Sequence, residues 1–324
     1  MARVDVVVVS FNSRETLRDC VRPLCEDGEI AVIVVDNAST DGSADVIADL
    51  PALVVRRTVN AGFAAGCNDG WRAGTAPYVL LLNPDARIGP DAVRALARLL
   101  DENPGTGAVA PRIMTAEGSL DFSQRRHARR RSTFARALFL HRLFPSSAWV
   151  DDVVRDETRY RAPGDAEWLS GACILARRSA LEEVGGLDER FFMYCEDDDL
   201  CRRLWNAGFA VRFDPAVTCI HAGGVSAPRG RLLPVLAASR IDYARKHGTR
   251  ASAWLERAGL ALGAATHLLT PKGGGVRAGH ARTLRIAFAR DPRATALAAS
   301  GLENVDEPAT GTPATPSADL STPS

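Results

Sequence analysis

The stretch Leu80-Leu81-Leu82-Asn83-Pro84-Asp85 (LLLNPD) ends an apolar run abruptly at a polar turn. An uninterrupted run of large apolar residues is typical of a strand that is buried on both faces of a parallel sheet. Proline stops ladder pairing, and a carboxylate at the mouth of a buried strand is costly unless a cation or a donor meets it. The stretch therefore predicts either a simple turn or a ligand site at the end of a central strand.

Similar strands recur on both sides of this stretch, with helical patterns between them. The predicted strands are residues 4–10, 30–35, 53–56, 78–82 and 107–110. The predicted helices are residues 14–25, 43–50, 61–74 (with a glycine-rich loop) and 90–100. Strands that alternate with helices predict an α/β fold, with a mostly parallel central sheet flanked by helices.

The regular pattern stops at Pro111 and returns at residue 167. Residues 112–166 are irregular and basic, and we interpret them as an insertion. The later predicted elements are the helices 179–184, 199–206, 232–247 and 252–269 and the closing strands 210–213 and 216–220. We therefore predict a domain at 1–228, a basic helical C-terminal region at 229–300 and a disordered tail at 301–324.

Polar residues gather after each of the first four strands. Ligands of open α/β sheets bind outside the carboxyl ends of the strands, so these residues are candidates for one site. Turn propensity explains any one of them, but less readily all four positions. Neither a dinucleotide-binding glycine motif nor a P-loop is present. The candidates are Ser10, Asn12, Asp36, Asn37, Asn60, Gly62, Asn68, Asn83 and Asp85.

A second acidic cluster, Glu196 to Asp199, follows the apolar residues 191–194. Asp198 and Asp199 suit the N-terminus of the next helix, where the macrodipole favours negative charge. Glu196 and Asp197 remain as candidates for a general base whose pKa is tuned by its setting. His221 ends another apolar run, and it is either structural or, beside a carboxylate site, a metal ligand.

Composition excludes some classes of function. The chain has 324 residues, and its 40 Lys and Arg nearly balance 39 Asp and Glu, so no global field favours nucleic acid. The charge is nevertheless unevenly distributed along the chain, because residues 125–142 contain seven arginines and no Asp or Glu. Seven cysteines without a CxxC pair are typical of reduced thiols in the cytoplasm. With no signal peptide before Val4 and no apolar run long enough to span a bilayer, we expect a cytoplasmic protein, soluble or peripheral on the inner face of the membrane.

Six motifs in order resemble family 2 glycosyltransferases of the GT-A fold, closest to bacterial rhamnosyltransferases of cell-wall and O-antigen assembly. They are VVVVSFNS, VVDNASTDGS, NAGFAAGCN, LLLNPDA, the segment from WLSG to CEDDDLCRRLWNAGF, and IHAGG, which together span about residues 4–225. The resemblance implies a nucleotide-diphospho-sugar donor, a divalent metal (Mn²⁺ or Mg²⁺) and inversion by a single displacement.

The resemblance also implies roles for individual residues in the donor site. Asp36 would accept a hydrogen bond from the pyrimidine base, and Asn60, Gly62 and Asn68 would line the donor. Asp85 would be the metal-binding carboxylate of the family's DxD element. Asn83 replaces the other carboxylate of that element, which predicts weaker metal binding, although its amide oxygen is still a ligand.

Further roles fall on the later motifs. His221 would be a second metal ligand or a pyrophosphate contact. Asp197 would deprotonate the acceptor hydroxyl, with Glu196 in support. The sugar and acceptor pocket would be shaped by Trp168, Ser170 and Gly171.

The favoured function is transfer of a sugar, L-rhamnose from dTDP-rhamnose, to a lipid-linked or cell-envelope glycan acceptor. The alternatives are a transferase that uses another donor such as a UDP-sugar, and a degenerate scaffold that only binds nucleotide sugars. The basic segment 125–131 with the apolar residues after it suits an anionic membrane surface or a polyprenyl-diphosphate acceptor. A solvated loop with a short amphipathic helix explains it equally well, and the sequence fixes no oligomeric state.

Overall fold

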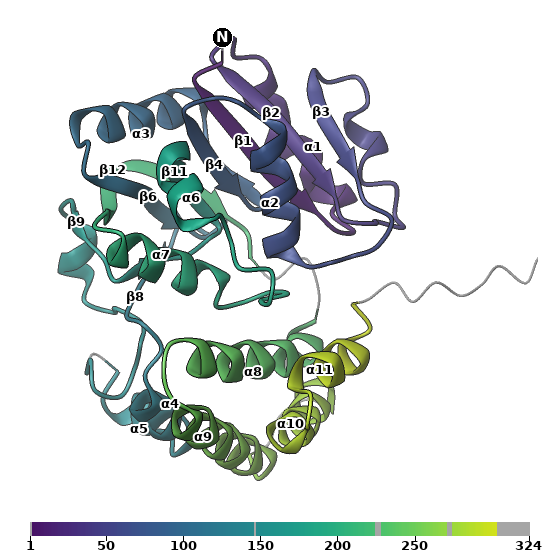
Figure 1. Cartoon of the computed structure of the whole chain (residues 1–324), viewed down its shortest axis with the longest axis vertical. Coiled ribbons are helices and arrows are strands. Elements are labelled where there is room, and N and C mark those ends of the chain that lie inside the picture. The colour runs from purple at the N-terminus through teal and green to yellow at the C-terminus, as the bar shows by residue number, and fades with distance from the viewer. Residues whose placement is uncertain (1, 146, 224–227, 271–273, 303–324) are drawn as a thin grey trace, which may run out of the picture.

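Valine and leucine side chains fill the strands at the centre of the sheet. The computed structural model describes residues 2–145, 147–223, 228–270 and 274–302 (Figure 1). Strand β1 (Val4–Ser10) is buried at every position and pairs in parallel with β2 (Ile30–Asp36) and β4 (Tyr78–Leu82). Strand β3 (Ala52–Arg56) pairs in parallel with β2. Burial on both faces accounts for the continuous apolar runs in the sequence.

Alternate residues of β1 pack on opposite faces of the sheet, as the two-residue period of a strand requires. Val4, Val6 and Val8 share one core with helices α1 (Arg14–Cys25) and α3 (Pro90–Glu102). Val7 and Val9 share the other core. The helices of that second core are α2 (Phe63–Ala73), α6 (Arg178–Val184) and α7 (Glu196–Asn206).

The second half of the sheet is mixed. Strand β11 (Cys173–Arg177) lies between β4 and β6 (Thr106–Met114) and is antiparallel to both. Strand β12 (Ala210–His221) runs parallel to β6, and the short β5 (Ala86–Arg87) closes the edge. The order is β3-β2-β1-β4-β11-β6-β12-β5, which confirms the predicted α/β class with a mostly parallel sheet.

Several predicted boundaries were wrong. The two closing strands are one strand, β12, whose register shifts between Asp214 and Thr218, where Pro215 cannot donate to the ladder. Strand β6 continues past Pro111 to Met114, and residues 43–50 contain only a 3-10 turn, Asp45–Ile47. Helix α7 begins at Glu196 and not at residue 199, so all four carboxylates belong to its first turn.

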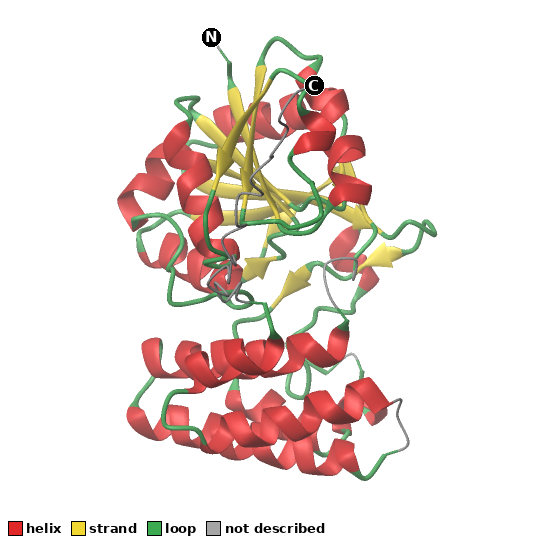
Figure 2. Ribbon diagram, turned by 90° about the vertical axis from the view of Figure 1, so that its right-hand side faces the viewer, coloured by secondary structure: helices red, strands yellow, loops and turns green. Residues whose placement is uncertain are grey.

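The C-terminal region is a layer of helices below the sheet domain (Figures 1 and 2). Its helices are α8 (Arg229–Lys246), α9 (Arg250–Leu268), α10 (Gly274–Phe288) and α11 (Pro292–Ser300), of which the last two were not predicted as separate helices. The insertion contributes α4 (Arg130–Ala137) and α5 (Leu140–Leu143). Helix α4 packs closely on α9, since a Cβ at Gly259 would lie 3.0 Å from Thr133 Cγ2. The insertion thus joins the C-terminal helices.

The remaining elements of the insertion are short. They are β7 (Leu120–Asp121), β8 (Gln124–Arg125), the 3-10 turn Glu157–Tyr160 and β9 (Gly164–Asp165), with β10 (Trp168–Leu169) following and pairing with β8. All seven cysteines are free thiols. In the described part of the chain, no helix is both long enough and apolar enough to cross a bilayer. From residue 303 on, the predicted tail lies outside the described residues.

Candidate active site

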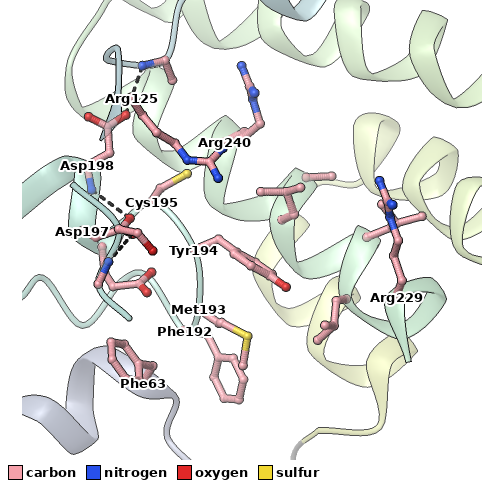
Figure 3. A pocket seen from close by; sticks show the side chains of 18 of the residues that line it. Phe63, Arg125, Phe192, Met193, Tyr194, Cys195, Asp197, Asp198, Arg229 and Arg240 are labelled. Atoms are coloured by element: carbon pink, nitrogen blue, oxygen red, sulfur yellow. Dashed lines mark hydrogen bonds between the residues drawn. The ribbon is translucent and has the colours of Figure 1, made fainter. Parts of the chain in front are cut away.

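A cavity of about 1070 Å³ lies between the carboxyl ends of the strands and the C-terminal helices. Figure 3 shows its interior, with Asp197 on one wall and Arg229 on the opposite side. The volume is at the upper end of the range of about 300–1,000 Å³ that is usual for small-molecule pockets. The predicted residues that line it are Asn37, Asn60, Gly62, Asn83, Asp85, Trp168, Ser170, Gly171, Glu196, Asp197 and His221.

Asparagine amides fix the loops that follow β2 and β3. Asn37 Nδ2 donates to Asn60 Oδ1 at 2.7 Å and to the carbonyl of Gly62 at 3.1 Å. Gly62 has φ +95°, and a Cβ at this position would lie 2.3 Å from the carbonyl oxygen of Phe192. Glycine is therefore required where this loop crosses the segment that leads to Asp197.

Four of the predicted donor residues do not line the cavity. Ser10 is fully buried, and its hydroxyl has no hydrogen-bond partner among the described residues. Asn12 accepts a bond from Thr40 N at 2.9 Å, and Asp36 accepts one from Ser39 N at 3.1 Å, so both shape the loop after β2.

Asn68, the fourth of these residues, is buried within α2. Its amide donates to the carbonyl of Leu187 at 2.8 Å and to Glu189 Oε1 at 2.8 Å, and its oxygen accepts from Trp71 Nε1 at 3.0 Å. Asn68 thus anchors the segment that leads to residues 191–197, and the structure does not bring it to the cavity.

Asp85 and His221 converge at the end of β4. His221 Nε2 lies 3.2 Å from Asp85 Oδ1 and 3.3 Å from Asn83 Nδ2, and both side chains of the Asp–His pair are largely buried. Burial alone would lower the pKa of His221, but the hydrogen bond and charge of Asp85 outweigh it, and the pKa is raised. Asn83 also extends the strand pairing, since its N–H donates to Ala172 O at 2.9 Å.

This cluster fits a divalent cation that shares its coordination with a substrate. Among the described residues, no group of three or more His, Cys, Asp or Glu side chains is arranged to hold a metal. Mg²⁺ typically takes one or two carboxylates and completes its shell with water and substrate phosphates, and imidazole nitrogen also suits Mn²⁺. Asp85, His221 and the amide oxygen of Asn83 would be the protein's ligands.

Asp197 projects into the cavity from the first turn of α7. Its Oδ2 accepts from Gly171 N at 3.1 Å and its Oδ1 from Asp198 N at 2.9 Å. Burial raises the pKa of Asp197 to about 6, although those backbone bonds and Arg125 act in the opposite direction. A carboxylate with a pKa near neutrality is well suited to general-base chemistry.

Glu196 lies next to Asp197 and is more deeply buried. Burial, followed by the charge of Asp197, raises the pKa of Glu196 well above its usual range. Its Oε2 has no hydrogen-bond partner in the described residues. Because two neighbouring carboxylates do not ionise together easily, a charge on Asp197 disfavours ionisation of Glu196.

Asp198 and Asp199 do more than stabilise the start of a helix. Asp198 Oδ1 accepts from Tyr243 Oη at 2.8 Å and lies 2.5 Å from His127 Nδ1. Asp199 lies 2.6 Å from Lys246 Nζ and 2.7 Å from His247 Nε2. Burial opposes ionisation of Asp199, but these partners lower its pKa to about 2. These two carboxylates attach α7 to α8 and to the insertion.

The insertion reaches the site through Trp168. Its indole Nε1 donates to the carbonyl of Arg126 at 2.8 Å, and Arg125 Cζ lies 5.7 Å from the centroid of the Trp168 ring. Ser170 N donates to Ser123 O at 3.1 Å, which holds the strand next to Gly171. Arg125 and Arg229 also line the cavity, and no spacing in the sequence connects them with Asp197.

The architecture defines the class of protein as an α/β chain of the GT-A fold. The sheet carries a carboxylate–histidine cluster at one strand end, and a separate carboxylate with a raised pKa shares the same cavity. Residues 5–185 match the model of glycosyl transferase family 2, and the chain belongs to this family. It is accordingly a glycosyltransferase.

Curated relatives include rhamnosyltransferases. The chain is 33% identical to the N-acetylglucosaminyl-diphospho-decaprenol L-rhamnosyltransferase of Mycobacterium tuberculosis (strain ATCC 25618 / H37Rv), over 61% of this chain and 68% of that protein. It is 46% identical to rhamnosyltransferase WbbL of Escherichia coli (strain K12), but over only 17% of this chain and 21% of that protein.

Two solved structures share the fold. The mannosyltransferase PcManGT from Pyrobaculum calidifontis, in complex with GDP-Man and Mn²⁺, has a TM-score of 0.51 at 19% identity and covers 92% of this chain and 86% of its own. GalNAc-T7 with UDP, GalNAc and Mn²⁺ has a TM-score of 0.53 at 14% identity, and the match covers 78% of this chain and 51% of that chain. These likenesses confirm the GT-A fold.

Proposed function

We propose that the protein transfers L-rhamnose from dTDP-rhamnose to a hydroxyl of a lipid-linked glycan, with inversion at the anomeric carbon. The observation that carries the proposal is the presence of two different acidic centres in one cavity. Asp85 and His221 would hold the cation that binds a diphosphate, and Asp197 would accept the proton of a hydroxyl group. The names of the rhamnosyltransferase relatives support the choice of sugar and acceptor.

The donor would lie along the strand ends. Asn37, Asn60 and Gly62 would contact it, and Asp36 would shape the loop beside the base. The diphosphate would face Asp85 and His221. A divalent cation held there would neutralise the charge that develops on the leaving diphosphate.

Asp197 would act on the acceptor. It accepts the proton of the attacking hydroxyl while the oxygen bonds to the anomeric carbon and the bond from that carbon to the diphosphate oxygen breaks. One displacement inverts the configuration. Glu196, kept protonated by burial, leaves the single negative charge of the pair on Asp197.

A membrane-facing surface accords with a lipid-linked acceptor, and we infer that the helical layer contacts anionic lipid. Large apolar side chains are exposed on α5, α9 and the adjoining turns, including Leu143, Phe144, Trp254 and Leu269. Exposed apolar side chains among arginines are typical of interfacial attachment. Sedimentation with vesicles of phosphatidylglycerol should exceed that with phosphatidylcholine, and equal sedimentation would contradict this role.

The transfer proposal is tested by a panel of donors. The full chain is incubated with dTDP-rhamnose, UDP-sugars or GDP-sugars, with Mn²⁺ or Mg²⁺, and with a synthetic prenyl-diphosphate glycan as acceptor. We expect thermal stabilisation by dTDP-rhamnose and glycan extension. Transfer with a UDP-sugar alone would overturn the choice of donor. Donor binding without transfer or hydrolysis for every sugar would instead indicate a nucleotide-sugar-binding scaffold.

A further inference from the structure

The cavity extends well beyond the groups that would react. On the side away from the sheet, residues of α8, α9 and α10 line it. The walls of this extension, here called the helical chamber, carry half-buried apolar side chains. They are Leu232, Leu233, Leu236, Leu260 and Val276. None of these residues has a role in the proposed chemistry.

The helical layer has a small core for its length. The buried core residues that link α8, α10 and α11 are Ala237, Ala238, Ile241, Ile286 and Ala296, with Leu260 packed against them. The larger leucines of α8 lie along the chamber instead of filling this core. Apolar walls gain most from an apolar occupant, because water cannot hydrogen-bond to them.

Positive charge accompanies the apolar walls. Arg125, Arg142 and Arg229 line the cavity, and none of them pairs with a carboxylate within the described residues. Arg240, in contrast, is paired with Glu256 at 2.7 Å. In Figure 3, Arg229 lies on the far side of Tyr194 from Asp197. Arginines without an acidic partner suit a phosphate ligand.

Some residues of the cavity have exposed apolar neighbours in the sequence. Arg142 and His267 line the cavity. Their sequence neighbours Leu143, Phe144 and Leu269 have exposed fractions of 71%, 58% and 87%. The cavity lining therefore includes residues that lie within two positions, along the chain, of exposed apolar side chains.

We propose that the helical chamber binds a polyprenyl diphosphate, with its phosphates on Arg229 at the start of α8 and its chain along the leucine wall. This inference rests on the proposed function, because such a molecule is the lipid part of the acceptor. It adds the location of the lipid and the residues that select it. The anionic head of such a molecule would pair with arginine, and its branched apolar chain would pack against the leucines.

Binding without donor or metal tests the inference apart from catalysis. Isothermal titration compares farnesyl diphosphate, isopentenyl diphosphate, inorganic diphosphate and palmitate on the full chain. We expect farnesyl diphosphate to bind at least about tenfold more tightly than each of the other three, since only it offers both the head and the chain. Affinities within twofold for farnesyl and inorganic diphosphate would overturn the proposal, as would equal binding of palmitate.

Two variants locate the binding. Leu236→Trp should fill the chamber and abolish the preference for the longer chain, whereas Leu255→Trp, which does not line the cavity, should keep it. Arg229→Gln should weaken all three diphosphates, and Arg285→Gln on the exposed side of α10 should not. Each variant's melting temperature confirms folding. An unchanged chain-length preference in Leu236→Trp, or an unchanged affinity for diphosphates in Arg229→Gln, would place the lipid elsewhere.

This test and the test of function fail in different ways. Transfer to a short, water-soluble glycan acceptor, with no chain-length preference in binding, would refute the chamber and leave the glycosyltransferase proposal intact. Farnesyl diphosphate binding without any sugar transfer would support the chamber while the proposed function failed.

Discussion

The two halves of the cavity are built in different ways. On the sheet side, the functional groups lie at a strand end or within a few residues of one, as Asn37 directly follows β2 and Asp85 lies three residues after β4. On the helical side, the groups come from distant parts of the chain and are held by buried polar pairs such as Arg240–Glu256 and Asp198–Tyr243. Local topology thus sets the proposed donor side, and tertiary packing sets the proposed acceptor side.

This difference suggests that the two halves separate in function as well. Changes on the sheet side should alter donor and metal binding, whereas changes on the helical side should alter stability and the acceptor. Asp197 lies between the halves, since it sits on a helix that is anchored to α8. Its loss should have the largest effect on the rate.

Asp197→Asn should lower kcat by about 10²–10⁴-fold, because an amide cannot accept the acceptor's proton. The KM for the donor should stay close to that of the parent. Steady-state transfer kinetics provide the measurement, and Asp165→Asn, an exposed carboxylate away from the cavity, is the matched control. A variant that keeps more than a third of the rate would remove Asp197 from the role of base.

Glu256→Ala should destabilise the helical side by up to about 3–5 kcal/mol, because it removes the nearer of the two carboxylates beside the largely buried Arg240 and leaves only Asp152, at 3.9 Å. Urea unfolding measures the loss. Glu183→Ala, which removes an exposed side chain on α6, should cost about 0.5 kcal/mol or less. An equal loss of unfolding free energy in the two variants would contradict the view that buried polar pairs stabilise the helical side.

Asp85→Asn should weaken metal-dependent donor binding by about 10–100-fold, on the scale of lost metal-site interactions. Titration of Mn²⁺ in the presence of the donor provides the measurement. Asp91→Asn at an almost fully exposed position is the control. Equal Mn²⁺ dependence in the parent and in Asp85→Asn would exclude this carboxylate as a ligand.

The pH profile of transfer should rise through about pH 6, the pKa of Asp197. Below that pH the carboxyl carries a proton and cannot act as a base, so the rate should fall by up to about tenfold per pH unit. Arg125 lowers the pKa of Asp197, so Arg125→Gln should move the midpoint to higher pH. A midpoint that does not move, or that moves to lower pH, would contradict this coupling.

Asn83→Asp should have the smallest effect, about a few-fold tighter Mn²⁺ binding, because ligand charge tunes cation affinity. Asn83 Nδ2 already lies 3.3 Å from His221 Nε2, so the new carboxylate would lie beside Asp85 and His221. The half-saturating concentration of Mn²⁺ measures the change. Weaker binding would mean that Asn83 acts through its amide nitrogen alone.

Sequence patterns predicted the sheet side of the fold well, because hydrophobic periodicity is local. The runs that form β1, β2 and β4 are continuous, and the turn residues after them mark the strand ends. The patterns predicted a helical region at 229–300 but not the separate helices α10 and α11 within it, whose small residues and arginines, such as Ala281 and Arg282, give little amphipathic contrast. They also placed the start of α7 three residues too late, since its first turn is unusually acidic.

The site was predicted in part for the same reason. Asp85, His221 and Asp197 belong to motifs that can be recognised along the chain, and the structure places all three at one cavity. His127 and Tyr243 could not be predicted, because they reach Asp198 only through tertiary packing. Asn68 was expected to line the nucleotide-sugar site. Its side-chain amide is instead fully hydrogen-bonded to Leu187, Glu189 and Trp71.

The most direct test of the division between the two acidic centres measures donor binding and transfer side by side in Asp197→Asn and Asp85→Asn. The account predicts that Asp197→Asn binds dTDP-rhamnose and Mn²⁺ like the parent but transfers sugar at least about 10²-fold more slowly, whereas Asp85→Asn loses metal-dependent binding first. Equal loss of binding and transfer in both variants would contradict it, because the two carboxylates would then serve one centre.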